Sequence, residues 1–282
     1  MARTLRLVAA AAAVAALAAQ QAAAVGPSLW VVENGAQISA PRSDVRFVVG
    51  QRGGGTRVTA VATRSRRVLH ATKLPGRWGL QATTIHGTLS GLSADARTLV
   101  LARPADDPGG LRTRSEFVVL HGAALTRGAR FGLRGDFTVD ALSPHGRTLY
   151  LIEHLPGADV TRYRVRAYDL AAHRLLPRVI ADKRQAGWTM RGMPLDRVVG
   201  HGARWVYTLY SSGGNYPFVH ALDTVAGTAV CVGVPLDWRD ATMNAARLQL
   251  RGGGRILEVE GPNVKTPVRI DTRTLRVMHA PS

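Results

Sequence analysis

The sequence predicts an all-β protein made of about five similar units of about 50 residues each. A pattern of turn and strand recurs along the chain, and helical periodicity is almost absent after residue 24. The roughly 258 residues that follow residue 24 are enough to bury a sizeable core as one large domain or two small ones.

The first 24 residues have the pattern of a cleaved secretory signal. Arg3 and Arg6 supply its positive start, residues 7–17 are a run of Leu, Val and Ala, and Ala22 and Ala24 fit a small-x-small cleavage site. The alternative is a transmembrane anchor, but this apolar run is well below the roughly 20 residues that span a bilayer. We therefore expect a secreted, extracytoplasmic protein without a transmembrane anchor.

This interpretation divides the chain into a signal peptide, residues 1–24, and one repeat domain, residues 25–282. Cys231 is the only cysteine, so the chain forms neither an internal disulfide nor a thiol metal cluster. The repeat domain must therefore be held together by burial alone.

The net charge is strongly positive. It is +18 for the full sequence, and removing Arg3 and Arg6 leaves +16, which suggests an anionic partner such as a cell-wall polymer or lipid headgroups. However, 34 of the 37 basic residues are arginine and they are spread along the chain, which equally fits the codon bias of a GC-rich genome and a solvated surface. Nucleic acid is not expected for a protein that leaves the cell.

The first recurring element is a tight turn followed by a strand. Residues 93–101 (SADARTLVL) match residues 143–151 (SPHGRTLYL) position by position, with weaker copies at 201–207, 252–259 and 41–49. Gly, Asp and small residues tolerate the left-handed backbone of a hairpin turn, and the apolar residues after it suit a buried strand. An arginine recurs in four copies at spacings of 50, 57 and 51: Arg97, Arg147, Arg204 and Arg255.

A further strand is expected before each turn, as at residues 79–89, 137–142 and 245–250, so that each copy forms a hairpin. The second recurring element is another hairpin, whose first strand ends near an aspartate in three of the units. These aspartates are 54 and 48 residues apart, in phase with the arginines: Asp169, Asp223 and Asp271. An aspartate there can accept hydrogen bonds from amides two residues on, which is a structural role.

Each unit is therefore predicted to contain four antiparallel strands. Such a sheet cannot bury both its faces alone, whereas radial stacking against neighbouring sheets does so and leaves only short edges. A two-domain β-sandwich is the alternative architecture.

Residues 143–151 resemble the Ser-x-Asp-Gly-Arg/Lys-x-Leu-Tyr-Val signature of the YVTN and TolB-like (WD40-like) β-propellers. Residues 165–170 (VRAYDL) are similar to the strand and Asp-Thr turn of the same blades. The Asp-Gly of the signature is replaced by Asp95-Ala96 and His145-Gly146, and the likeness is strong in two units and weak in three. The resemblance implies a β-propeller of about five four-stranded blades, and it hardly constrains function.

No catalytic or cofactor motif is evident. Propellers that bind pyrroloquinoline quinone repeat Ala-x-Asp-x-x-Thr-Gly-x-x-x-Trp, and residues 221–231 match only in part, so we expect no cofactor. Gly-x-Ser-x-Gly is absent, residues 211–214 are a hairpin loop without a following helix, and Asp106-Asp107 lacks the spacing of a calcium loop. Cys231 lies in an apolar strand, where a small buried side chain is the simpler interpretation.

The nine histidines form no metal-binding pair such as His-x-x-x-His. Glu153-His154 is the only adjacent pair of acid and imidazole, and neighbours on a strand point to opposite faces. We therefore predict no metal site, although histidines from different blades meeting at a central channel stay an open alternative.

Loops are the better place for a binding site, because strands hold them in fixed positions. Aromatic side chains beside polar or charged ones are typical of recognition surfaces. The alternative is that these aromatic residues pack between blades. The candidate binding residues lie in three predicted loops: Glu153, His154, Tyr210, Asn215, Tyr216, Trp238 and Arg239.

These observations favour a non-enzymatic binding or interaction module at the cell envelope, with an envelope polymer or another protein as partner, and acting as a monomer. The alternative is a hydrolase or lyase directed at glycan or cell-wall material, with acids and histidines converging at the propeller centre. A surface binder driven by charge alone is a third possibility, and its affinity would fall steeply as salt rises.

Overall fold

The computed structural model describes residues 30–41, 43–106, 110–157, 159, 161–182, 189–211, 216–236, 244–261 and 266–278. The predicted signal peptide lies outside these residues, so it stays a prediction. Within the described ranges, no helix has the length and apolar character needed to cross a membrane.

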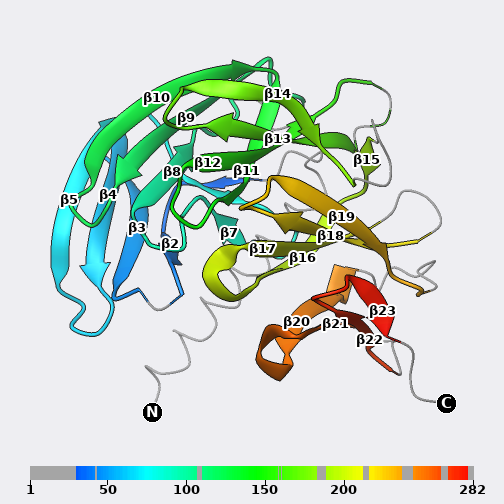
Figure 1. The fold of residues 1–282 in the computed structure, drawn as a ribbon. Coiled ribbons are helices and arrows are strands. Elements are labelled where there is room, and N and C mark those ends of the chain that lie inside the picture. Colours follow the sequence, from blue (N-terminus) through cyan, green and yellow to red (C-terminus); the bar gives the residue numbers. More distant parts are fainter. Residues whose placement is uncertain are drawn as a thin grey trace, which may run out of the picture.

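Five antiparallel sheets follow one another along the chain, and each is built from one continuous segment (Figure 1). We call each sheet with its connections a blade and number the blades from 1 to 5. Blade 1 contains β2 (Ala36–Ser39), β3 (Val45–Arg52), β4 (Gly55–Ala62) and β5 (Val68–Pro75). Blade 2 contains β8 (Thr98–Ala102), β9 (Arg114–His121) and β10 (Thr126–Arg134). Blade 3 contains β11 (Asp136–Leu142), β12 (Thr148–His154), β13 (Arg162–Asp169) and β14 (Arg174–Ile180), and β15 (Met190–Arg191) pairs with β13.

The last two blades repeat this order. Blade 4 contains β16 (Pro194–Val199), η1 (His201–Ala203), β17 (Trp205–Tyr210), β18 (Phe218–Asp223) and β19 (Thr228–Gly233). Blade 5 contains β20 (Arg247–Arg251), η3 (Gly252–Gly254), β21 (Ile256–Glu260), β22 (Val268–Asp271) and β23 (Arg276–Met278). Three short strands form a separate small sheet in the order β1-β6-β7: β1 (Val31–Val32), β6 (Leu80–Ala82) and β7 (Leu89–Ser90).

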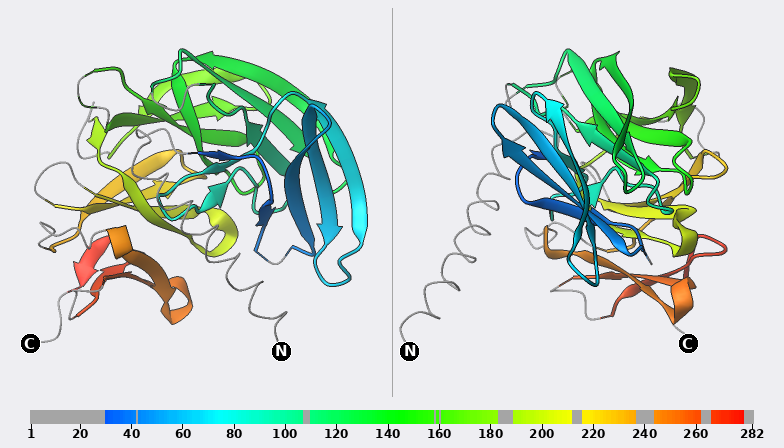
Figure 2. Two further views of the ribbon diagram at one scale, coloured as in Figure 1. Left: turned by 180° about the vertical axis from the view of Figure 1, so that it is seen from behind. Right: turned by 90° about the vertical axis from the view of Figure 1, so that its left-hand side faces the viewer.

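The blades pack face to face around a common centre, as a β-propeller does (Figures 1 and 2). One apolar cluster joins blades 1 and 2, a second joins blades 2 and 3, a third joins blades 3 and 4, and a fourth joins blades 4 and 5. Blades 2, 3 and 4 therefore bury both faces. A two-domain sandwich would bury only one face of each sheet, so the prediction of a propeller of about five blades is confirmed. Blades 1, 3, 4 and 5 have the predicted four strands, and the sheet of blade 2 has three.

Blade 5 ends the series with an ion-paired face. Leu257 and Val259 are fully buried against blade 4. Glu258 lies between them and points to the opposite face, where it accepts hydrogen bonds from Arg251 (3.1 Å) and Arg269 (2.9 Å). A polar outer face is what the terminal unit of a stacked array requires.

The inner edge of blade 2 is split, which corrects the expected single strand over residues 79–89. Gly79 and Leu92 each pair with β8, while residues 83–88 leave the sheet as a loop. Gly91 has a φ of +112°, and a Cβ there would clash with the carbonyl oxygen of Val100. The inner edge of blade 2 therefore needs glycine at this position.

The two recurring hairpins of each blade are joined by the same backbone hydrogen bond. In four blades the carbonyl of the phased arginine accepts it. Because the bond uses only backbone atoms, Asp44 takes the same place in blade 1. The donors and acceptors are Thr63 to Asp44 (2.7 Å), Gly122 to Arg97 (2.8 Å), Leu170 to Arg147 (3.1 Å), Thr224 to Arg204 (2.7 Å) and Thr272 to Arg255 (3.0 Å).

The phased aspartates have the predicted structural role. Each uses one carboxylate oxygen to accept hydrogen bonds from the backbone amides two and three residues later, at 2.7–3.0 Å. The residues are Asp169, Asp223 and Asp271. In blade 2 His121 occupies this position, and the turn keeps its shape without the carboxylate.

These two kinds of turn lie at the same end of every blade, because successive strands are antiparallel. We call this end the turn face. The opposite end, the loop face, carries the remaining connections, including the longer ones between β8 and β9 and between β14 and β16. The regular part of the repeat is thus separated in space from its variable part.

Candidate functional site

The centre of the propeller is occupied by the small sheet and by the loop of residues 83–88. Thr83 and Thr84 are buried there. The amide of Ile85 donates to the carbonyl of Pro194 in blade 4 (2.9 Å), and His86 contacts Arg247 in blade 5. The loop from blade 2 therefore contacts blades 4 and 5.

A buried ion pair joins blades 3 and 4 beside this loop. Arg197 donates to both the carboxylate and the carbonyl of Asp140, and both side chains are less than 5% exposed, at 4% and 2%. Arg197 also donates from Nε to Thr208 Oγ1 (3.0 Å), and Ser90 of β7 donates to the carbonyl of Asp140 (2.6 Å). Burial lowers the pKa of Arg197 to about 10, which leaves it charged at neutral pH.

A pocket of about 220 Å³ opens beside this ion pair, at the turn-face end of the centre. Blades 1, 2, 3 and 4 each contribute inner-strand residues to its wall, which is mainly aliphatic. Among the described residues that line it, the polar groups are four hydroxyls and one guanidinium: Ser39, Thr88, Ser90, Ser93 and Arg197. The pocket thus offers shape, apolar surface and hydrogen bonds, and its one charged side chain is already neutralised by Asp140.

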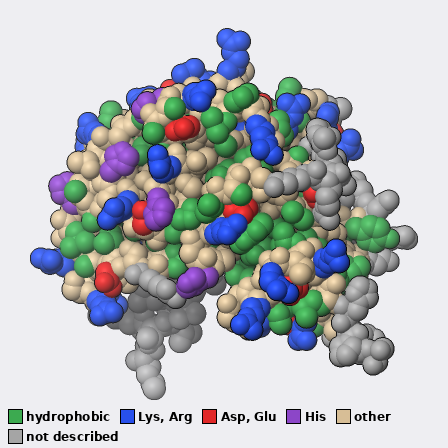
Figure 3. Space-filling view, in the orientation of Figure 1, with side chains coloured by type: hydrophobic (Ala, Val, Ile, Leu, Met, Phe, Trp, Pro, Cys, Tyr) green, Lys and Arg blue, Asp and Glu red, His purple; other side chains and the backbone are tan. Residues whose placement is uncertain are grey.

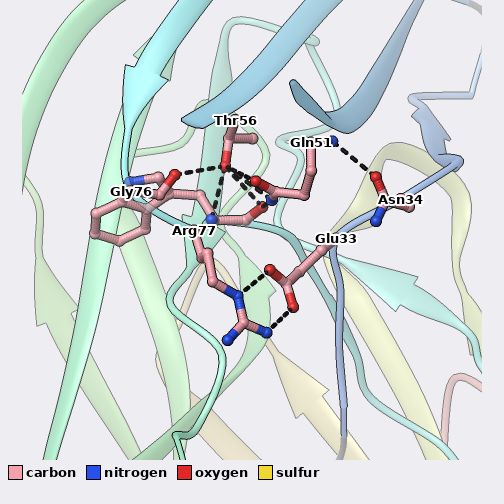
Figure 4. Close-up of polar contacts among 7 residues, drawn as sticks. Glu33, Asn34, Gln51, Thr56, Gly76 and Arg77 are labelled. Carbon is pink, nitrogen blue, oxygen red and sulfur yellow. Dashed lines mark hydrogen bonds and ion pairs between the residues drawn. The ribbon is translucent and has the colours of Figure 1, made fainter. Parts of the chain in front are cut away.

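A second polar cluster, shown in Figure 4, fixes the chain that enters the centre. Arg77 makes a two-bond ion pair with Glu33, at 2.8 Å from Nε and 2.6 Å from the second nitrogen. Thr56, fully buried, accepts from the amide of Trp78 (2.8 Å) and donates to the carbonyl of Gly76 (3.0 Å). These bonds tie the residue after β1 to the residues before β6, and they hold the residues before β6 against blade 1. This is a structural function.

Glu153 and His154 are the last two residues of β12, so the expectation that they lie in a loop is wrong. Apolar and β-branched residues continue the strand up to them, and the pairing with β13 extends to His154. Glu153 forms an ion pair with Arg166 (2.8 Å), and His154 is buried with Nε2 at 3.2 Å from Thr138 Oγ1. Burial lowers the pKa of His154 to about 4.

Tyr210 and Tyr216 lie in opposite environments. Tyr210 is only 1% exposed, and it stacks between Tyr163 and Phe218, with ring centroids at 4.9 and 5.3 Å. The alternative of packing between blades therefore holds for Tyr210. Tyr216 is 62% exposed on the loop face.

The remaining predicted binding residues lie outside the described residues: Asn215, Trp238 and Arg239. Their binding role, like that of Tyr216, stays a prediction. The structure brings Glu153 and His154 together as neighbours in one strand, and it does not join them with Tyr210 or Tyr216 in one pocket. Asp140 and Arg197 were not among the predicted site residues, although charged residues within these two inner strands were a visible signal.

No protein-family model matches this sequence, and no curated protein matches it either. Solved structures with a similar fold include the β-propeller domain of Myceliophteria thermophila Cps50 (Swd1), at 13% identity and a TM-score of 0.48, covering 86% of this chain and 67% of that one. A putative 6-phosphogluconolactonase from Bacteroides uniformis is similar at 15% identity and 0.45, covering 85% and 67%. TolB from Acinetobacter baumannii is similar at 12% identity and a TM-score of 0.44, and the match covers 84% of this chain and 51% of TolB. Likenesses at this level assign no function, and the fold assignment depends on the order and packing of the five sheets.

Proposed function

We propose that this chain is a secreted, extracytoplasmic β-propeller that serves as a non-enzymatic binding module at the cell envelope. The observation that carries the proposal is the lining of the central pocket. Its described side chains are aliphatic, hydroxyl-bearing or already ion-paired, as a site that binds without proton transfer requires. Four blades hold this wall in place, so the pocket is preformed.

The same lining weighs against the glycan-directed hydrolase or lyase. Glycoside hydrolysis commonly uses two carboxyl groups that flank the scissile bond, one of them as the acid. The carboxylate beside the pocket, Asp140, is 2% exposed and bound to Arg197. The described centre therefore supports recognition better than acid–base catalysis.

The size of the pocket limits what enters it. A volume of about 220 Å³ is below the 300–1,000 Å³ typical of small-molecule sites. The ligand is therefore one projecting group of a larger partner, either an envelope polymer or another protein.

The binding experiment blocks the pocket mouth and leaves the fold alone. Ser39 and Gln37 are both exposed, two residues apart on the same face of β2, and only Ser39 lines the pocket. We expect Ser39→Trp to lower the retention of the mature protein on isolated cell envelopes at least about tenfold, and Gln37→Trp to leave it unchanged. Equal retention of both variants would rule out the pocket, and retention that disappears at high salt in wild type would favour charge alone.

Export is tested separately. Expression of the full sequence in a bacterial host should give an extracytoplasmic protein whose N-terminal sequence begins at Val25. Recovery of the uncleaved chain from the cytoplasm would contradict the proposed localisation and would leave the pocket experiment valid.

A further inference from the structure

A second hollow lies on the turn face, between blades 2 and 3. It has a volume of about 500 Å³. Its walls come from the ends of β8, β9 and β10 and from the two turns of blade 3. Three of the nine histidines line it, together with one arginine: His121, His145, His173 and Arg147. Figure 3 shows several histidine side chains on the left half of this face, where blades 1 and 2 and the turns of blades 3 and 4 lie in Figure 1.

The three imidazoles are held by three different structural elements. His121 ends β9, and its ring lies directly over Gly128, where a Cβ would overlap it. His145 lies in the turn between β11 and β12, and its Nδ1 is 3.4 Å from Asp95 Oδ2. His173 closes the turn after β13 with a φ of +52°, which fixes its direction. All three are exposed to solvent.

Two carboxylates border this groove. Asp95 uses Oδ1 to accept from the Ser93 hydroxyl (2.6 Å) and from the Arg97 amide (3.0 Å), and its Oδ2 faces His145. Asp169 accepts from two amides of its own turn, and these bonds, with Arg174 and Arg147 nearby, hold its pKa below the usual range. Both carboxylates keep their negative charge, and Arg147 and Arg174 lie close to Asp169. Protonation of each imidazole adds one positive charge to the groove.

We propose that this groove binds a phosphate-bearing polyol or sugar unit, and that its histidines strengthen the binding as the pH falls. A guanidinium matches phosphate oxygens with two donors, and single N–H donors from several directions suit a tetrahedral anion better than a planar carboxylate. Among the described residues, no group of three or more His, Cys, Asp or Glu is placed to hold a metal ion, so the imidazoles serve as donors to the anion.

The groove is much larger than a phosphate group, which indicates an organic part to the ligand. Val119, Ala129, Leu170 and Ala171 form an apolar wall beside the histidines. This wall fits the carbon skeleton of a small polyol or sugar. The groove is separate from the central pocket, so this site does not depend on the proposed function.

Calorimetric titration of the mature protein with glycerol phosphate tests the proposal, with glycerol and inorganic phosphate as reference probes. Glycerol phosphate itself takes up a proton near pH 6, so affinities are compared between proteins at the same pH, and glycerol should show no binding. We expect the triple variant His121→Ala, His145→Ala, His173→Asn to bind glycerol phosphate at least about tenfold more weakly than wild type at pH 5.5, with a smaller difference at pH 7.5. Asn is chosen at residue 173 because it tolerates a positive φ.

His201→Ala is the matched control, because His201 lies in the corresponding turn of blade 4 and does not line the groove. Unchanged affinity in the triple variant, an equal loss with His201→Ala, or a loss in the triple variant that is as large at pH 7.5 as at pH 5.5 would overturn the proposal. Inorganic phosphate binding as tightly as glycerol phosphate would refute the organic part. If envelope retention fails while glycerol phosphate still binds, the proposed function fails and the groove stands.

Discussion

Asp223 shows at the scale of one residue how the repeat is stabilised. One of its carboxylate oxygens accepts from the amides of Val225 and Ala226, both at 3.0 Å. The other accepts two hydrogen bonds from Arg204, at 3.1 and 2.9 Å. Burial disfavours the charged form, but these bonds outweigh it and hold the pKa of Asp223 below its usual range.

Asp223→Ala should lower the free energy of unfolding by on the order of 2 kcal/mol at pH 7, because two turn amides and the Arg204 guanidinium lose their charged acceptor. A lowered pKa in the folded state means that this stabilisation is present above pH 4 and is lost as the pH falls further. Urea unfolding should therefore show a large difference from wild type at pH 7 and a smaller one at pH 3. Asp106→Ala, at an exposed position, is the control; an equal loss there would contradict this account.

The role of this residue was predictable because the aspartates and arginines recur in phase and act on backbone a few residues away. Asp140 and Arg197 were not predictable as a pair. They are 57 residues apart, and nothing local says that their blades bring them together. Long-range pairing of buried charges depends on the packed fold, which a local pattern does not contain.

At the scale of an element, the turn between the third and fourth strands uses a left-handed residue at the same place in all five blades. Its φ lies between 52° and 63° in each case. Only blade 4 has glycine there, so the other four blades carry backbone strain. The residues are Arg66, Leu125, His173, Gly227 and Leu275.

His173→Gly should therefore stabilise the protein by about 1 kcal/mol, because glycine adopts this φ without strain. Ala172→Gly, one residue earlier, is the matched control and should destabilise it by about 0.4–1 kcal/mol through the greater freedom of the unfolded chain. Urea midpoints at pH 7.5 measure both. If both variants shift the midpoint in the same direction, the turn is not strained at residue 173.

Element predictions succeeded where the phased turns flank a strand on both sides. They failed at residues 79–89, because a loop leaves the sheet there to find partners in blades 4 and 5. They also failed at Glu153 and His154, where two polar residues continue β12 beyond its apolar part. Tertiary contacts decided both cases.

At the scale of the whole molecule, two histidines are buried in the interior and neutral at pH 7. Burial lowers the pKa of both His154 and His220 to about 4. The ordinary value is about 6.5, so the unfolded chain binds more protons between these two pH values. Their contribution to stability is complete above pH 6.5 and is lost as the pH falls toward 4.

Each histidine should cost roughly 3 kcal/mol of stability when the pH falls from 7 to 4. Urea unfolding at pH 7.5, 6 and 5 should show this decline in a range where most carboxylates are still charged. His220→Gln should reduce the slope by about half. If the imidazole NMR signals of either residue titrate near pH 6.5 in the folded protein, the predicted pH dependence of stability is wrong.

The loop of residues 83–88 also determines the order in which the protein can be completed. Strands within each blade are neighbours in sequence, and such local contacts form early during folding. Ile85, by contrast, waits for Pro194, more than one hundred residues later. The blades can assemble one after another as synthesis proceeds, but the axis is finished only when blade 4 arrives. The contacts of this loop, which belongs to the half of the chain that is synthesised first, therefore form only after the second half has folded.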